Sequence, residues 1–255
     1  MKVSNLSITL LVLSTLVAIL APFVVYRVLN RTQKLSRKAV LIGAATFVVF
    51  ALILEQLLHA VVIPRLQGKV LLTIIYGCLA AGIFEEVGRY LMYKTFLKGK
   101  TEWKDGIAFG LGHGGIEAIL LVGVANIQAI VMAVMVNAGR FGEIAAKLPK
   151  EVADNALNSL VNTPPLMFAA SGVERLFALV LQIFFSLVVL YGIRCRKNIY
   201  LIYAILAHAL MDVSAALYQT KVITSVSVIF LALAVMAVGA FYAIVKFKRA
   251  FAAEC

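Results

Sequence analysis

The chain has 255 residues, of which 63% are hydrophobic and only 14% are charged, and its mean hydropathy is +0.99. A soluble domain carries about 25% charged residues, so the composition excludes a soluble globular protein. The net charge of +12 does not indicate nucleic-acid binding, because the lysines and arginines stand between hydrophobic runs, where they set membrane topology.

Continuous apolar runs of roughly 18 residues or more predict an all-α, polytopic bundle of about seven to eight transmembrane helices. The runs lack the alternation that is typical of a membrane β-barrel. We expect residues 1–255 to form one integral-membrane, protease-like domain. The spans are expected at residues 6–28, 39–63, 70–93, 104–122, 123–138, 166–193, 199–218 and 222–246.

Four clusters of lysine and arginine separate or follow these spans, near residues 27–38, 94–104, 194–197 and 246–249. If all four are cytoplasmic, the N-terminus is outside the cell membrane and the C-terminus is inside. Residues 105–138 must then cross the membrane an odd number of times, although they are long enough for two short helices. Either a full span is followed by a re-entrant helix, or the charge rule fails for one loop.

The polar stretch before the sixth expected span and the cysteines say less about function. Residues 139–165 are the longest polar stretch, and they predict an amphipathic surface helix that is stopped by Pro164-Pro165. The three cysteines are scattered and form no CxxC motif, so they predict neither a disulfide framework nor a structural zinc site.

Ionisable side chains are costly in lipid, and when several share one depth they usually mark a functional site. At 1.5 Å per residue, Glu85, His113 and His208 each lie roughly 12–14 Å from the basic end of their helices. Three helices therefore bring polar groups to one layer, and we expect a shared cavity that opens toward the cytoplasm. The three motifs are Glu85-Glu86-x-x-Arg89, Phe109-x-x-x-His113 and His208-x-x-x-Asp212.

The paired glutamates of the first motif point in different directions, because adjacent residues diverge by about 100° around a helix. Arg89 is one turn from both Glu85 and Glu86, so it can pair with either carboxylate. One of the two glutamates could then be an ionised base, while the other forms a structural ion pair with Arg89. The alternative is a buried Glu–Arg pair that only holds helices together.

Histidine is scarce in this chain, which has three. The one-turn spacing places Glu117 on the face of His113, and it places Asp212 where its carboxylate could fix the tautomer of His208. His59 pairs by spacing with Glu55 in the outer half of its helix, and we expect a structural role there, with substrate entry as the alternative.

Several protease classes are excluded by missing motifs. HExxH and GxSxG do not occur, so a zincin helix and a nucleophile elbow are absent. Aspartyl intramembrane proteases need two aspartates within their helices, and only Asp212 qualifies.

The order of the three motifs resembles the CPBP group of intramembrane proteases, which includes CAAX prenyl endopeptidases and bacterial bacteriocin-processing and immunity proteins. The group pattern is EExxxR, then FxxxH, then HxxxN or HxxxD. Arg89 stands one residue earlier than that pattern requires, and residues 84–90 (FEEVGRY) are closer to the YhfC-type bacterial branch. The resemblance gives Glu86 and Arg89 supporting roles.

The resemblance implies hydrolysis of a peptide bond within the membrane. Glu85 would be the general base that activates water, and His113 would help to hold that water. His208 and Asp212 would stabilise the oxyanion. The substrate would be a membrane protein or a lipidated peptide, and the other partner is the lipid bilayer.

No cofactor is favoured, because Arg89 lies beside the site and disfavours a cation. Zinc is the alternative, since Glu85, His113 and His208 offer three ligands and leave one position for water. Two other functions compete with a glutamic-type protease. A proton-coupled transporter also uses intramembrane Glu, His and Arg, and a non-catalytic immunity or assembly protein would use these groups to join helices.

Overall fold

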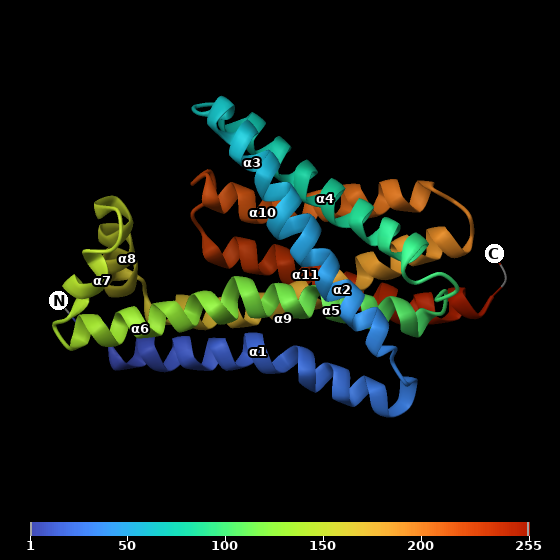
Figure 1. The fold of residues 1–255 in the computed structure, drawn as a ribbon, viewed down its shortest axis with the longest axis horizontal. Helices are drawn as coiled ribbons and strands as arrows, with labels where there is room; N and C mark the ends of the chain where they lie inside the picture. Colours follow the sequence, from blue (N-terminus) through green and yellow to red (C-terminus); the bar gives the residue numbers. More distant parts are fainter. Residues whose placement is uncertain (1, 254) are drawn as a thin grey trace. The chain divides into compact units, whose positions relative to one another are not determined.

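A computed structural model describes residues 2–253 and residue 255, and these residues are helical apart from short connections (Figure 1). Within the described residues, seven helical segments are long and apolar enough to cross a membrane, so the prediction of an all-α, multi-span protein is confirmed. The spans are α1 (Asn5–Gln33); the consecutive α2 (Arg37–Thr46), η1 (Phe47–Glu55), α3 (Gln56–Val62) and η2 (Ile63–Leu66); α4 (Val70–Thr95); the consecutive α5 (Trp103–Glu117), η3 (Ala118–Val124) and α6 (Ala125–Asn137); α9 (Pro165–Arg194); α10 (Ile199–Gln219); and α11 (Val226–Ala252).

The segment that was expected as two helices, residues 104–122 and 123–138, is one continuous 35-residue helix, Trp103–Asn137. The stretch around residues 123–128 holds no proline, and the chain adapts there by widening to the π-helix η3 instead of breaking. The expected division into two helices was therefore wrong. A single crossing here gives the odd number that the charge pattern requires.

The polar stretch 139–165 also differs from its prediction. It forms two short helices, α7 (Phe141–Ala145) and α8 (Lys150–Asn162), instead of one. Pro149 precedes α8, and Pro165 is the first residue of the next span. Proline is favoured at the first helical position because its missing N–H has no partner to lose there. The prolines thus begin helices here as well as ending them.

Cys195 and Cys255 are joined by a disulfide, which the scattered cysteine pattern did not predict. They are 60 residues apart in sequence but meet in space, because the C-terminal end of α11 returns to the turn between α9 and α10. Spacing along a chain carries no information on such a long-range pair. Cys78 remains a free, buried thiol.

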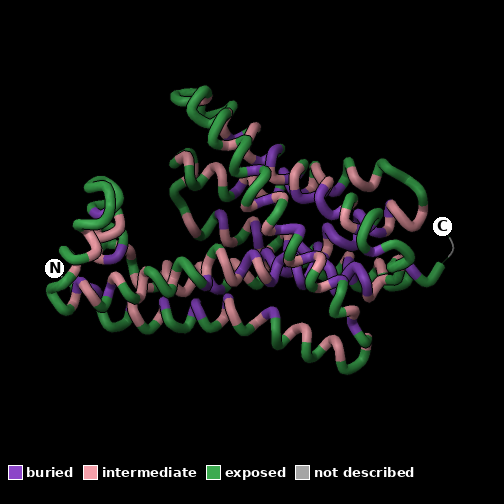
Figure 2. The backbone as a smooth tube through the Cα atoms, in the orientation of Figure 1, coloured by how far each residue is buried: buried purple, intermediate pink, exposed green. Residues whose placement is uncertain are grey.

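The chain divides into two compact units. The first contains residues up to Phe23 together with Glu117–Leu176, and its core joins α1, α6 and α8 through Leu11, Ala133 and Leu160. The second contains Val24–Ile116 and Phe177–Cys255. Figure 2 shows that α4, α5, α9 and α10 carry many buried positions, and the three polar motifs belong to this second unit.

Glycines set the helix that carries the second motif between its neighbours. A Cβ added at Gly112 would lie 1.9 Å from the carbonyl oxygen of Val40 on α2, and one added at Gly110 would lie 2.5 Å from the Cα of Ile183 on α9. Backbones can approach this closely only where the side chain is a hydrogen atom. The glycines around His113 therefore fix the position of its ring relative to both neighbouring helices.

Candidate active site

Arg89 occupies the centre of a buried polar cluster in the second unit. Its side chain is fully buried, and one Nη lies 3.3 Å from Oε2 of Glu85, while its Nε lies 3.1 Å from Oε1 of Glu86. Both pairings that the one-turn spacing allowed are therefore present at once. The guanidinium fork permits this, because its donors point in several directions within one plane.

The other edge of Arg89 faces α9. It donates to the carbonyl oxygen of Gln182 at 2.9 Å, to Oγ of Ser186 at 2.6 Å and to the Gln182 side-chain oxygen. The amide of Gln182 in turn donates to Oε2 of Glu85 at 3.2 Å. The sequence analysis missed both residues of α9, although their one-turn spacing within an apolar span was the same signal that identified the three motifs.

His113 extends from α5 into the same cluster. Its Nε2 lies 2.8 Å from Oε2 of Glu85, and the ring is fully buried. The ring of Phe47 meets it edge-on at 5.3 Å, and Phe109 lies one turn before it with a centroid distance of 6.4 Å. The aromatic neighbours hold the imidazole in one orientation, with one nitrogen directed at the carboxylate.

His208 reaches the cluster from α10. Its Nδ1 lies 2.6 Å from Oε1 of Glu86, and its Nε2 lies 3.8 Å from Oε2 of Glu85 and 3.6 Å from Oδ2 of Asp212. A carboxylate only accepts hydrogen bonds, so Nδ1 carries the proton that points at Glu86. Glu86, rather than Asp212, therefore receives the Nδ1–H hydrogen bond of His208, while Phe185 stacks on the ring at 4.8 Å.

The structure thus brings together the six polar side chains of the three motifs. Counted along their helices, Glu85, His113 and His208 are ten, ten and nine residues from Thr95, Trp103 and Ile199, where the helices end or begin. These separations correspond to about 14–15 Å, so the groups form one layer, as their spacing from the basic clusters indicated.

Other polar residues noted in the sequence lie elsewhere. Glu117 pairs with Arg175 at 2.8 Å, and Arg175 also pairs with Glu174; all three belong to the first unit. His59 joins Glu55 at 3.1 Å and the hydroxyl of Tyr76 at 2.9 Å in the second unit.

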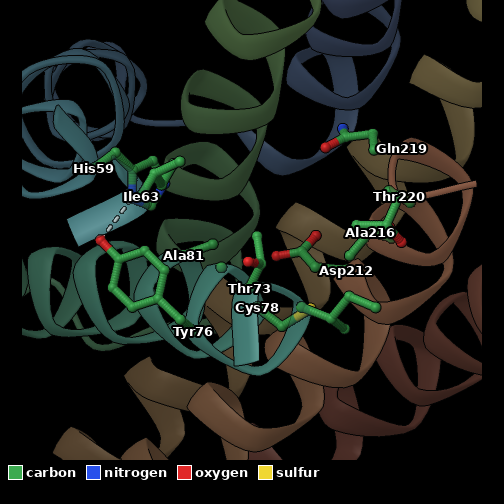
Figure 3. A pocket seen from close by; sticks show the side chains of 13 residues that line it. His59, Ile63, Thr73, Tyr76, Cys78, Ala81, Asp212, Ala216, Gln219 and Thr220 are labelled. Carbon is green, nitrogen blue, oxygen red and sulfur yellow. Dashed lines mark hydrogen bonds between the residues drawn. The ribbon is translucent and has the colours of Figure 1, made fainter. Parts of the chain in front are cut away.

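A cavity of about 320 Å³ lies next to the polar cluster, between α3, α4 and α10 (Figure 3). It is lined by residues toward the beginning of α4 and the end of α10, opposite to the basic ends of these helices. This differs from the expected opening toward the basic end. The basic end is filled by large side chains such as Tyr93, Leu97 and Leu190, whereas small residues such as Gly77 and Ala81 line the cavity.

These features define a multi-pass membrane protein with a buried site of carboxylate, imidazole and guanidinium groups. The family model described as YhfC intramembrane metalloprotease matches residues 16–233, and the chain belongs to this YhfC family. It is also similar to the membrane protein YhfC of Bacillus subtilis (strain 168), with 40% identity over 256 residues, covering 98% of this chain and 99% of that protein. No solved structure matches the chain.

The family description implies a metal ion, and the donor set of the site fits zinc by type. Glu85, His113 and His208 offer one carboxylate and two imidazoles, a combination found in catalytic zinc sites. His208 also has the carboxylate partner on its second nitrogen that metal-bound histidines usually have. Within the described part of the chain, no three such side chains are already spaced as a metal site, because these donors hydrogen-bond to one another.

Proposed function

We propose that this chain is an intramembrane endopeptidase in which Glu85 activates water for attack on a peptide bond. The substrate is a membrane-embedded protein or a lipidated peptide. One observation carries the proposal. Every contact of the Glu85 carboxylate within the described residues is made by Oε2, which meets His113, Gln182, Arg89 and His208. Oε1 is left to receive a proton from a water molecule.

The surrounding groups keep Glu85 in place as a base. His113 and Gln182 donate to Oε2 from two different helices, so the carboxylate cannot rotate without losing both hydrogen bonds. A base that is held within reach of the reacting water contributes about 10²–10⁴-fold to the rate of proton transfer. Glu86 and Arg89 support this arrangement, because together they neutralise one another and anchor Gln182 and His208.

We assign to His208 the stabilisation of the oxyanion that forms in the tetrahedral intermediate. With a proton on both ring nitrogens, this imidazole donates Nδ1–H to Glu86 and directs Nε2–H toward the space beside Glu85. A preplaced donor in a site shielded from water stabilises developing charge most effectively. An ionised Asp212 has no hydrogen to donate, so its contribution is to orient His208 and to face the substrate.

A zinc-dependent version of the same reaction is the second candidate. The family description and the hydrogen bond between Glu86 and His208 favour it. Glu85, His113 and His208 would hold the metal, which when bound lowers the pKa of a coordinated water to about 7. Against it, the guanidinium of Arg89 lies 3.3 Å from the carboxylate oxygen that the metal would need. We therefore favour the glutamic mechanism.

We also propose an orientation of the chain in the membrane. The four basic clusters favour a cytoplasmic location for the ends where α1, α4, α9 and α11 finish. With seven crossings, the N-terminus is then outside the cell and the C-terminus inside. We further propose that residues 1–255 act as one protease domain.

The test compares the new protein N-termini in membranes from cells that carry the native chain or Glu85→Gln at equal abundance. Termini that arise only with the native chain would support proteolysis and identify the substrate. Gly239→Ala is the matched control, because nothing lies within 4 Å of the added methyl group. Identical profiles for all three chains would contradict the proposal and favour a transporter or an assembly protein.

The two chemical mechanisms separate on purified protein. The glutamic mechanism predicts cleavage of the identified substrate that persists in 1,10-phenanthroline, and less than one zinc ion per ten chains by mass spectrometry. One tightly bound zinc per chain, lost together with activity on chelation and restored by added zinc, would overturn the metal-free version.

A further inference from the structure

The cavity between α3, α4 and α10 begins directly beside the candidate catalytic groups. Ala81 lines it one turn before Glu85 on α4, and Asp212 lines it one turn after His208 on α10. Residues one turn apart share a helix face, so the cavity and the two catalytic groups lie along one continuous surface. A peptide whose carbonyl carbon is attacked at Glu85 would have its neighbouring residues in this cavity.

A single carboxylate lines the cavity, and it also lies 3.6 Å from Nε2 of His208. Asp212 is the only formally charged residue among those that line it, and none of them is a lysine or an arginine. Figure 3 shows the Asp212 carboxylate turned from α10 toward the side chains of α4.

A second carboxylate stands behind the opposite wall. Glu55 is buried and pairs with His59, whose other nitrogen meets the hydroxyl of Tyr76 in the cavity lining. The wall therefore adds two polar tips, the imidazole and the phenol, to a space that is otherwise lined largely by small side chains.

We propose that this cavity is a specificity subsite that takes the ammonium or guanidinium group of a lysine or arginine in the substrate. The assignment to a substrate rests on the proposed endopeptidase function. Asp212 lies one helical turn, about 5.4 Å, from the layer of His208. An extended peptide advances about 3.3 Å per residue, so the basic residue stands within about two positions of the scissile bond.

The polar lining distinguishes this subsite from a pocket for a prenyl or acyl chain. A wholly apolar ligand would leave Asp212 and the tips of His59 and Tyr76 without water and without new partners, which is costly. A long basic side chain instead places its methylene groups along Ile74, Ala215 and Ala216, and its charge at Asp212. The ammonium of a phosphatidylethanolamine head group shares this chemistry, and the experiment separates the two sources.

Cys78 supplies a reporter that does not depend on catalysis, because its thiol lines the same cavity and the other two cysteines form a disulfide. Purified full-length protein in phosphatidylcholine nanodiscs is treated with aminoethyl or sulfonatoethyl methanethiosulfonate under non-reducing conditions. Each rate is divided by the rate of the same reagent with a free small thiol. We expect the cationic reagent to be favoured at least about tenfold, as charges a few ångströms apart at a protein surface imply.

Asp212→Asn should reduce this preference by about fivefold or more, and Asp212→Ser serves as a second variant if the first does not fold. Asp154→Asn is the matched control, because Asp154 is exposed on α8, in the other unit. Equal normalised rates for the two reagents, or a preference that survives both variants, would overturn the subsite.

Protection experiments identify the source of the cation. A single-span peptide with one lysine should slow the labelling of Cys78, whereas the same peptide with norleucine should not. Protection by phosphatidylethanolamine nanodiscs alone would overturn the peptide assignment. Glu85→Gln should keep the reagent preference, so the subsite can stand even if no proteolysis is found. If cleavage is found, sites without enriched lysine or arginine within two positions would contradict the subsite while leaving the endopeptidase intact.

Discussion

Glu85 and Glu86 are neighbours in sequence, yet the structure predicts opposite consequences when each is changed to glutamine. Glu86 has no exposed surface, and its Oε1 is shared by Nδ1 of His208 at 2.6 Å and Nε of Arg89 at 3.1 Å. Glu85 is 6% exposed, and its partners include neutral donors from His113 and Gln182. We expect Glu86→Gln to lower stability most and Glu85→Gln to lower activity most.

The expected loss of unfolding free energy depends on which charges remain paired in each variant. Glu86→Gln leaves the buried Arg89 with one carboxylate instead of two and directs an amide N–H toward one of two donors, which costs about 3 kcal/mol, the lower end for breaking a buried pair. Glu85→Gln leaves Arg89 paired with Glu86 and keeps an oxygen for one donor, at a cost of about 1–2 kcal/mol. Interhelical hydrogen bonds in membranes average only about 0.6 kcal/mol, so the loss of charge pairing dominates the difference.

The assay is unfolding of both variants in mixed micelles of increasing dodecyl sulfate content, followed by circular dichroism and combined with cleavage of the substrate that the N-terminal profile identifies. Glu86→Gln should unfold at a clearly lower dodecyl sulfate fraction than Glu85→Gln, and Glu85→Gln should lose at least about 10²-fold in cleavage rate, as removal of a general base implies. If Glu85→Gln were the less stable variant, or if Glu86→Gln unfolded like the native chain, the division into a base and a structural ion pair would be wrong.

Three further predictions follow from the same contacts. Gly43→Ala places a methyl group 2.1 Å from the carbonyl oxygen of Phe109 and should cost more than about 3 kcal/mol, beyond the usual range for overpacking, while Gly239→Ala should be neutral in the same unfolding assay. Gln182→Leu removes donors and acceptors for Glu85 and Arg89, and it should slow cleavage about tenfold or more with KM little changed, an outcome that steady-state kinetics would contradict if only KM rose. Impermeant maleimide should label a cysteine introduced at Lys150 in intact cells and spare one introduced at Lys98, and the reverse pattern would invert the proposed topology.

The sequence was sufficient for those parts of the fold and site that rest on local physics. Hydropathy located the apolar segments, although it divided Trp103–Asn137 in two, because crossing a bilayer requires a long apolar run whatever the helix packs against. The one-turn spacing within each motif placed pairs such as Glu85 and Arg89 on one helix face, and the structure shows these contacts. Counting residues from the basic clusters was enough to predict that the motifs share one layer.

Features that depend on contacts between helices were not accessible in this way. Gln182 and Ser186 share the one-turn spacing of the motifs, but only the packing of α9 against α4 shows that they face Arg89. The partner of His208 is Glu86 on another helix, although Asp212 has the closer spacing in sequence. The position of the cavity depends on where large and small side chains meet across helices, which a single-helix pattern does not contain.

Two features at the basic ends of the helices indicate opposite sides of the membrane. Basic residues cluster at four places and favour the cytoplasm, whereas the disulfide between Cys195 and Cys255 lies beside the third cluster and is typical of an oxidising compartment. We give the charge signal more weight, because four clusters agree on alternate loops, whereas the disulfide is a single pair of cysteines. Under the cytoplasmic assignment that we propose for the basic ends, the cavity with Asp212 would face the outer leaflet. A basic residue at the outer end of a substrate span is uncommon under the same charge rule. The subsite would thus select a small class of membrane segments out of the many that share the bilayer.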